Sequence, residues 1–269
     1  MDLSKVKLVV SDMDGTLLNQ KGEVSDRFFQ LIKQLKAKNI YFTAASGRQY
    51  HSIIDKLASI KDEIYVVAEN GGIVKKNDEI LLINTIKPDK LLQLIPKLRK
   101  IENSYIVLCG KDAAYIETKN VDFIDMFQEY YAAYKVVDDL IEIVNETDFL
   151  KIAIYHYESS EEFIYPKVKG LENDFLIKIS GPNWLDLSDS NTNKGNGLNV
   201  IQDLLNISKE ETMVFGDFHN DIEMMEQAHF SFAMENAHKD IKKIARFSTT
   251  DNNNFGVEII LEKLLKAKN

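Results

Sequence analysis

Four short runs of apolar and β-branched residues recur along the chain, and each ends in polar residues or glycine. They are VKLVVSD (Val6–Asp12), IYFTAASG (Ile40–Gly47), IYVVAENGG (Ile64–Gly72) and TMVFGD (Thr212–Asp217). Runs that are apolar throughout, without alternating polar positions, are typical of strands buried on both faces of a parallel sheet. The sequence therefore predicts a parallel sheet with both faces covered.

Helical patterns lie between these runs. In SDRFFQLIKQLKAKN, Ser25 is a plausible N-cap, and Phe28, Leu31, Ile32 and Leu35 fall on one stripe. RQYHSIIDKLASI and GLNVIQDLLNI have similar patterns. Because strands alternate with helices, we expect an α/β fold with a doubly wound parallel-sheet (Rossmann-like) core.

The middle of the chain, from about Ile86 to Gly181, has a different pattern. DDLIEIV and FLKIAIYHY alternate better than the outer strands, which favours an antiparallel sheet with one solvated face. We predict that residues 85–182 form an α/β domain inserted into a core domain made of residues 1–84 and 183–269. INTIKP and ISGPNW are the expected crossing points. The aromatic stretch FIDMFQEYYAAY has helical spacing and is interpreted as core or interface of the inserted domain, not as a binding site.

Composition excludes several classes of partner. The chain has 269 residues, a net charge of −9 and a pI near 5.2. Such a surface repels nucleic acid and anionic membranes. Cys109 is the only cysteine, so an intrachain disulfide is impossible and a reducing compartment fits. With no signal-peptide pattern and no stretch of membrane-span length, we expect a cytoplasmic protein, monomeric or weakly homo-oligomeric.

Polar residues with catalytic potential follow the predicted strands. In open α/β sheets, ligands bind beyond the carboxyl ends of the strands. The residues at those ends, together with the lysine that opens the glycine-spaced NKGNGL, are Asp12, Asp14, Thr16, Ser46, Gly47, Arg48, Lys194, Asp217, Asn220 and Asp221. The set holds four carboxylates but only two cations.

This imbalance points to a metal ion. Two unit charges about 4 Å apart interact by roughly 4 kcal/mol at an effective dielectric constant near 20. If the carboxylates converge, their repulsion exceeds what one lysine offsets, and a divalent cation is the natural remedy. The donors are all oxygen, which favours Mg²⁺ bound by one or two carboxylates plus a substrate phosphate.

With Mg²⁺ in place, the residues fit phosphoryl transfer. Asp12 is the expected nucleophile, because a carboxylate attacks phosphorus without prior deprotonation. Asp14 is the expected general acid that protonates the leaving oxygen and then the base that activates water.

The remaining residues fit binding roles. Thr16 and Ser46, with backbone N–H groups near Gly47, are expected to hydrogen-bond the phosphoryl group, and Lys194 to balance its charge. Asp217 is expected to hold the metal ion together with Asp12, while Asp221 and Asn220 orient these ligands. Arg48 is explained equally well as a substrate ligand or as a surface ion-pairing residue.

The motifs resemble those of the haloacid dehalogenase superfamily of phosphotransferases. DMDGT resembles its first motif, ASGR supplies the hydroxyl of the second, Lys194 in NKGNGL resembles the third, and GDFHND the fourth. The order is that of the family, and the long gap between motifs two and three resembles members with a class II cap.

SGR, ENGG and NKGNGL resemble the Cof-like branch, whose α/β cap is of the B subtype. That branch mostly hydrolyses small phosphorylated metabolites with Mg²⁺, such as sugar phosphates and cofactor precursors. The resemblance implies that the backbone carbonyl at Asp14 also binds the metal ion. Phe218, where a small or polar residue is common, and Glu235, where glycine is usual, depart from the family pattern.

Mg²⁺-dependent hydrolysis of a small phosphate monoester through an aspartyl-phosphate is thus the expected function. Three alternatives stay open. A phosphomutase would return the phosphoryl group to substrate, a regulatory phosphoacceptor would retain it, and a non-catalytic binder would hold phosphate esters without turnover. Asp14 disfavours the phosphoacceptor, because a second acid after the nucleophile promotes rapid hydrolysis.

Overall fold

Two compact units make up the chain. The structure is a computed structural model and describes residues 2–268. The first unit consists of the chain up to Ser46, Ile53–Leu82 and the chain from Asn193 onward; the second consists of Gly47–Ser52 and Ile83–Thr192. Each unit is built around its own sheet.

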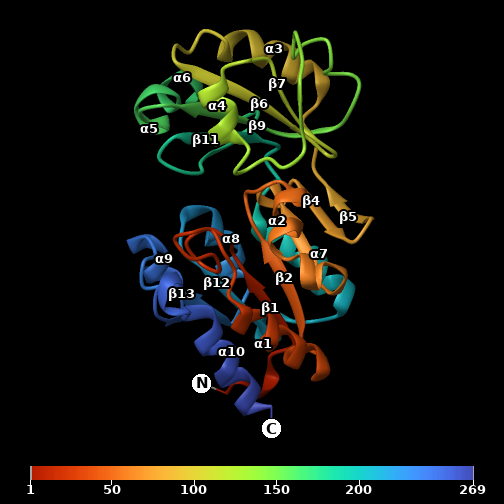
Figure 1. Ribbon diagram of the computed structural model, residues 1–269, viewed down its shortest axis with the longest axis vertical. Coiled ribbons are helices and arrows are strands. Elements are labelled where there is room, and N and C mark those ends of the chain that lie inside the picture. The colour runs from red at the N-terminus through yellow and green to blue at the C-terminus, as the bar shows by residue number, and fades with distance from the viewer. Residues whose placement is uncertain (1, 269) are drawn as a thin grey trace. The chain divides into compact units, whose positions relative to one another are not determined.

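The sheet of the first unit is predominantly parallel. Its strands, in spatial order, are β14 (Phe247–Ser248), β13 (Phe230–Ala233), β12 (Thr212–Gly216), β1 (Leu8–Ser11), β2 (Tyr41–Ala45), β3 (Tyr65–Ala68), β4 (Ile73–Lys76) and β5 (Glu79–Ile83). The pairs from β14 to β3 are parallel, and β4 pairs antiparallel with β3. Figure 1 shows β13, β12, β1 and β2 side by side in this order.

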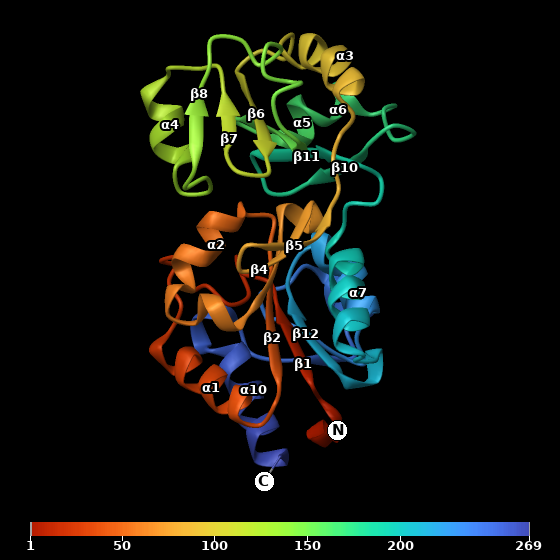
Figure 2. The same ribbon diagram turned by 90° about the vertical axis from the view of Figure 1, so that its right-hand side faces the viewer.

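Helices cover both faces of this sheet. They are α1 (Asp26–Ala37), α2 (Tyr50–Lys56), α7 (Lys194–Leu205), α8 (Ile222–Glu226), α9 (Lys239–Ile244) and α10 (Gly256–Ala267). In Figure 2, α1 and α10 lie on one side of the sheet and α7 on the other. The chain winds from β1 toward β3 in one direction and from β12 toward β14 in the other, which confirms the predicted doubly wound core.

Short 3₁₀ turns complete the first unit. They are η1 (Leu3–Lys5), η2 (Ala58–Glu63), η3 (Glu69–Gly71), η4 (Lys209–Glu211), η5 (His219–Asp221) and η6 (Asn252–Asn254). Of these, η3 begins directly after β3, and η5 begins after Asp217 and Phe218, which follow β12.

Helix α1 forms as its sequence predicts. Ser25 caps the helix, since its Oγ accepts a hydrogen bond from the Phe28 backbone N–H at 3.0 Å. The residues buried on this helix are the four of the predicted stripe, Phe28, Leu31, Ile32 and Leu35. Their side chains hold α1 against the sheet through apolar burial.

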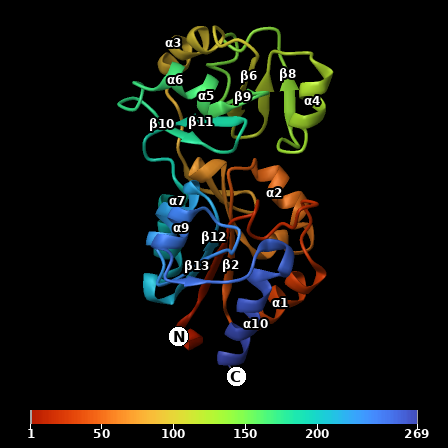
Figure 3. The ribbon, with the colours of Figure 1, turned by 90° about the vertical axis from the view of Figure 1, so that its left-hand side faces the viewer.

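The second unit has a mixed sheet. Its strands, in spatial order, are β10 (Leu176–Ile179), β11 (Trp184–Ser188), β9 (Phe149–His156), β6 (Ser104–Gly110), β7 (Ala114–Ile116) and β8 (Tyr134–Val136). All neighbours pair antiparallel except β7 and β8, which are parallel. Figure 3 shows β10 and β11 toward one edge of this sheet and β8 at the other. The helices are α3 (Pro88–Leu98), α4 (Val121–Phe127), α5 (Ser160–Phe163) and α6 (Tyr165–Val168).

Both faces of this second sheet are buried at β9, so the prediction of one solvated face is wrong there. All eight residues of β9 are buried. Ile152 and Ile154 belong to a cluster that includes residues of α3, whereas Ala153 and Tyr155 belong to a cluster that includes residues of α4. The alternation in the sequence thus separates two apolar cores, not a core from solvent.

Two further predictions for the middle block need correction. DDLIEIV (138–144) forms consecutive turns, and its apolar residues Leu140, Ile143 and Val144 pack in the α3-side core. The aromatic stretch does form core, but its helix α4 ends at Phe127, and Tyr134 already lies in β8. Period-2 and period-3.6 patterns are hard to separate over such short segments.

The compact units differ from the predicted domain limits in two places. The second unit also includes Gly47–Ser52, and it extends to Thr192, because β11 pairs with both β9 and β10. The transition between Leu82 and Ile83 lies close to the predicted limit at residue 84. The segment ISGPNW, the expected second crossing, connects β10 to β11. Within residues 2–268, no helix is both long enough and apolar enough to cross a membrane.

Candidate functional site

The first predicted site residues lie at the switch point of the doubly wound sheet. Asp12 directly follows β1 and Asp217 directly follows β12, and these two strands are parallel neighbours. The backbone N–H of Asp12 donates to the carbonyl of Phe215 at 3.1 Å, so the pairing continues to the strand ends. Here the chain connections that follow the two strands run in opposite directions. The space between these connections is where open α/β sheets bind ligands.

A buried lysine joins the acidic side chains. The carboxylates of Asp12, Asp217 and Asp221 form a group whose candidate ligand atoms all lie within 4.8 Å of one another. The Nζ of Lys194 donates to Asp12 Oδ1 at 2.5 Å and to Asp221 Oδ1 at 2.7 Å. The side chains of Lys194 and Asp221 have no exposed surface. Lys194 is the first residue of α7, so the amino end of that helix reaches this group.

Backbone and hydroxyl groups fix the orientation of the carboxylates. Asp221 Oδ2 accepts hydrogen bonds from the backbone N–H groups of Asp217, at 2.8 Å, and Phe218, at 3.1 Å. Thr16 Oγ1 donates to Asp217 Oδ1 at 2.9 Å. Gly15 has a φ of +77°, and a Cβ at this position would overlap the Asp217 carboxylate. The turn after β1 thus requires glycine for both its conformation and its close approach.

Burial and mutual repulsion perturb these groups. Burial, chiefly, and the charge of Asp221 raise the pKa of Asp217 to about 7. Burial also raises the pKa of Asp12 well above its usual range, against the opposing charge of Lys194. Burial alone would lower the pKa of Lys194, but the charges of Asp12 and Asp221 outweigh it and raise that pKa. The lysine therefore stays charged while its carboxylates repel one another.

This donor set fits a divalent cation. Three carboxyl groups share a single ammonium in this buried cluster, so one positive charge cannot balance all three of them when they ionise. The donors are carboxylate oxygens, the ligands of hard cations such as Mg²⁺. Burial is the main cause of the raised pKa of Asp217, the charge of Asp221 adds to it, and a bound cation would lower this pKa again.

Other predicted residues lie near the same edge of the sheet. Ser46 follows β2, is buried, and accepts a hydrogen bond on its carbonyl from the Asn70 N–H at 3.0 Å. Asn220 donates from Nδ2 to Asn70 Oδ1 at 3.0 Å, so it contacts η3. Asp14 is exposed and lies outside the group of three carboxylates, so its predicted chemical role stays a prediction.

Arg48 and Gly47 make contacts inside the second unit. Arg48 Nη1 donates to the carbonyl of Glu129 at 2.7 Å, and its guanidinium lies 5.1 Å from the centre of the Tyr130 ring. The carbonyl of Gly47 accepts a hydrogen bond from Lys151 Nζ at 2.9 Å. The structure thus gives Arg48 protein partners, in line with the structural interpretation of this residue.

Sequence reasoning did not select several polar residues around the cluster. Asn70 has a φ of +54° and orients Asn220, and Asn236 Nδ2 donates to the carbonyl of Gly15 at 2.8 Å. The positive φ of Asn70 agrees with its place in ENGG, where asparagine before glycine signals a left-handed turn. No spacing rule connects Asn236 with Gly15, which lies 221 residues earlier.

The family model described as haloacid dehalogenase-like hydrolase matches residues 9–261. The chain belongs to the haloacid dehalogenase-like hydrolases. The match covers all four motifs, so the resemblance predicted from them is confirmed. As a member of this family, the chain is an enzyme of the hydrolase class.

Individual relatives agree with this assignment. The chain is 36% identical, over 97% of its length and 97% of the relative, to an Escherichia coli (strain K12) protein named 5-amino-6-(5-phospho-D-ribitylamino)uracil phosphatase YbjI. It resembles the crystal structure of SMU.1108c from Streptococcus mutans UA159 with a TM-score of 0.88 and 25% identity, covering 97% and 99% of the two chains.

The HAD subclass IIB sugar phosphatase BT4131 has the same fold. Its TM-score to this chain is 0.83 at 20% identity, over 96% of this chain and 98% of that one. This likeness shows that an α/β core joined to a second α/β unit is a fold already known from solved structures.

The pKa of Asp217 predicts a pH-dependent stability of the metal-free protein. Between about pH 4 and pH 7, folded Asp217 retains a proton that the unfolded chain has lost, so the free energy of unfolding falls as pH rises through this range. Each additional proton held by the folded state changes this free energy by about 1.4 kcal/mol per pH unit. Urea denaturation at several pH values should show a shallower fall for Asp217→Asn than for the wild type. Equal slopes would contradict the shifted pKa.

Lys194 should be essential for stability as well as charge balance. Its replacement in Lys194→Met leaves Asp12 and Asp221 buried without their counter-charge, which typically costs about 3–5 kcal/mol. The double variant with Asp221→Asn should recover part of this loss. Lys33→Met, at an exposed position of α1, is the matched control and should change stability by less than about 0.5 kcal/mol. Similar urea midpoints for the two lysine variants would refute the assignment.

Proposed function

We propose that the protein is a Mg²⁺-dependent phosphatase that hydrolyses small phosphorylated metabolites through an aspartyl-phosphate. The observation that carries the proposal is the convergence of three carboxylates from the ends of β1 and β12 around one buried lysine. Phosphoryl transfer needs mainly positioning and electrostatic stabilisation, and this cluster offers both. The phosphatase names of relatives over the full chain length support the same reaction.

In the first step, a carboxylate oxygen of Asp12 attacks phosphorus. The new bond joins that oxygen to phosphorus while the ester bond breaks, and Asp14 gives its proton to the departing oxygen. In the second step, water attacks the phosphorus of the aspartyl-phosphate and gives a proton to Asp14. The bond to Asp12 breaks and inorganic phosphate leaves. Lys194, fixed between Asp12 and Asp221, orients the nucleophile and balances the phosphoryl charge.

Hydroxyl and amide groups near the cluster are proposed to bind the phosphoryl group. Thr16 lies in the turn after β1, Ser46 directly follows β2, and Gly47 is the next residue. In the structure the Thr16 hydroxyl donates to Asp217 Oδ1. When a phosphoryl group binds, this hydroxyl would donate to a phosphoryl oxygen in place of the Asp217 oxygen. Asn220, held by Asn70, keeps η5 next to this edge of the sheet.

Asp12 and Asp217 are the proposed metal ligands, with Asp221 and the carbonyl of Asp14 completing the protein's contribution. Bound Mg²⁺ would supply positive charge that neutralises the carboxylates and the transferring phosphoryl group. The proposal predicts that the same cation shifts Asp217 fully to its ionised form.

The substrate is proposed to be a small monoester such as a sugar phosphate or a cofactor-precursor phosphate. The relative from Escherichia coli is named for a ribitylaminouracil phosphate, which combines a polyol phosphate with a heterocycle. We also propose that residues 85–182 act as a cap that selects this substrate and excludes water during the first step. The transitions at Ile83 and Asn193 are the proposed hinges.

Phosphate release from a panel of phosphorylated metabolites, including 5-amino-6-(5-phospho-D-ribitylamino)uracil, tests the proposal. We expect Asp12→Asn to abolish turnover and Asp14→Asn to lower it by at least about 100-fold, the lower range for general acid–base catalysis. Excess chelator should stop the wild-type reaction. Full activity in either variant, or in chelator, would refute the assigned role.

The time course separates the alternatives. A phosphatase releases free phosphate continuously, whereas a phosphomutase converts one phosphate ester into another. A regulatory phosphoacceptor would retain the phosphoryl group. A phosphoenzyme that persists for many minutes in Mg²⁺ would therefore favour this alternative. Circular dichroism and urea denaturation of both aspartate variants show whether the fold is retained. Asp138→Asn, at an exposed aspartate, serves as the control.

A further inference from the structure

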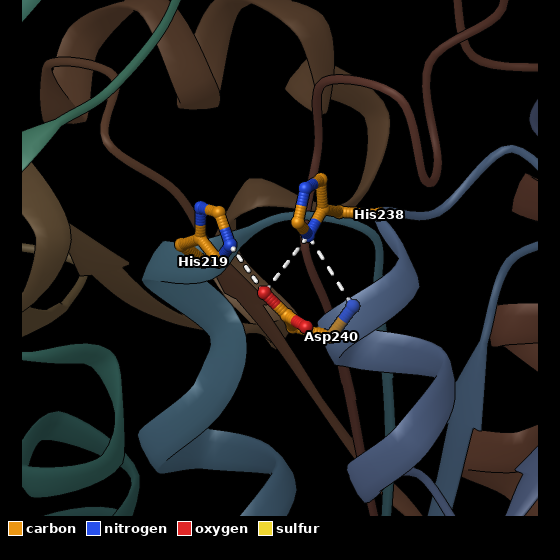
Figure 4. Close-up of side chains that lie close together, drawn as sticks. All are labelled: His219, His238 and Asp240. Atoms are coloured by element: carbon orange, nitrogen blue, oxygen red, sulfur yellow. Dashed lines mark hydrogen bonds and ion pairs between the residues drawn. The ribbon is translucent and has the colours of Figure 1, made fainter.

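A second group of potential metal ligands lies beside the acidic cluster and shares no residue with it. His219 in η5, His238 before α9 and Asp240 in the first turn of α9 place candidate ligand atoms within 4.8 Å of one another. Figure 4 shows both imidazole rings directed toward the Asp240 carboxylate. Their side chains are 40%, 31% and 42% exposed, so an ion from solvent can reach them.

The spacing of these atoms suits ligands of one ion better than hydrogen-bonded partners. Asp240 Oδ2 lies 3.4 Å from His219 Nε2 and 3.5 Å from His238 Nδ1. Hydrogen bonds between nitrogen and oxygen are usually about 2.7–3.2 Å long. Ligands about 2.0–2.2 Å from a tetrahedral zinc ion lie roughly 3.3–3.5 Å from each other. The distances from Asp240 Oδ2 to the two imidazole nitrogens therefore match the ligand-to-ligand distances around a tetrahedral zinc ion.

The tautomer of His238 is also suited to metal binding. The backbone N–H of Asp240 donates to His238 Nδ1 at 3.3 Å, which places a lone pair, not a proton, on that nitrogen. This contact is long, so an ion that competes for the lone pair displaces only a weak hydrogen bond. Lys243 Nζ contacts the other oxygen of Asp240, Oδ1, at 2.9 Å and leaves Oδ2 facing the imidazoles.

We propose that His219, His238 and Asp240 bind a divalent transition metal ion of the zinc class at a site separate from the acidic cluster. Two imidazole nitrogens and one carboxylate favour zinc, nickel or copper over magnesium, which prefers an all-oxygen environment. Three protein ligands leave a position for water or another small ligand. The two sites of this unit thus differ in the metal that each selects.

Occupation of this site affects the segment that carries Asp217 and Asp221. His219 lies between these two aspartates in the sequence, and the backbone N–H of His238 donates to the carbonyl of Asp217 at 2.8 Å. An ion bound by both histidines joins η5 to the start of α9. It therefore restrains the loop on which the acidic cluster depends, without contact to its carboxylates.

Calorimetric titration of Zn²⁺ into the full chain in excess Mg²⁺ tests the proposal. We expect one zinc ion per chain. Removal of an outer partner of a metal ligand typically costs 10–100-fold in affinity, so loss of a direct ligand should cost at least about tenfold. The variants are His219→Gln and His238→Asn, the latter chosen because asparagine keeps an acceptor at the N-cap of α9. His51→Ala, at an exposed histidine of α2, should bind zinc as the wild type does.

A variant of the other site and a spectroscopic probe make the result specific. Asp217→Asn should keep the zinc affinity, whether or not the protein proves to be a phosphatase. Co²⁺ in place of zinc should give visible absorption bands that both histidine variants lose. Lys243→Ala keeps all three ligands and should bind zinc at least as tightly as the wild type. Circular dichroism and thermal unfolding report whether each variant is folded.

Three results would overturn the proposal. They are an absence of zinc binding by the folded wild type, unchanged zinc affinity in both histidine variants, and loss of zinc binding in Asp217→Asn. The last result would place the ion in the acidic cluster.

Discussion

The structure depends on a buried charge imbalance at the end of two neighbouring strands. Lys194 contacts Asp12 and Asp221 inside the protein, while burial and the nearby charge of Asp221 raise the pKa of Asp217 to about 7. Burying charges costs several kcal/mol for each ion, and only well-placed partners offset that cost. One ammonium cannot neutralise three ionised carboxylates, and the proposed function assigns the remaining compensation to a bound divalent cation. In the proposed phosphatase reaction, the same positive charge would also stabilise the transferring phosphoryl group.

Sequence patterns predicted the parts of the fold in which local and tertiary preferences agree. The core strands are apolar throughout because both of their faces are buried, and Ser25 caps α1 as its position indicates. The middle block was harder, since β9 alternates between two apolar cores and therefore resembles a half-exposed strand. Which strands pair across long separations, as β11 does with β9, depends on tertiary packing that no local pattern contains.

For the site, the order of the motifs singled out five side chains that meet in the structure, whereas Asp14 lies outside their group. Asp12, Thr16, Lys194, Asp217 and Asp221 form one connected group, although 182 residues separate the lysine from Asp12. The contacts of Asn70 and Asn236 and the meeting of His219 with Asp240 were not predicted. They arise where turns such as η3 and η5 pack together, and turn packing has no periodic signal in the sequence.

Calorimetric titration of Mg²⁺ into the metal-free protein near pH 7, in buffers of different ionisation enthalpy, tests the charge imbalance most directly. The account predicts that one Mg²⁺ binds and that protons are released, since Asp217 is partly protonated at this pH. It also predicts that Asp217→Asn loses both the affinity and the proton release. Binding that is absent in the wild type, or equally strong without the Asp217 carboxylate, would contradict it.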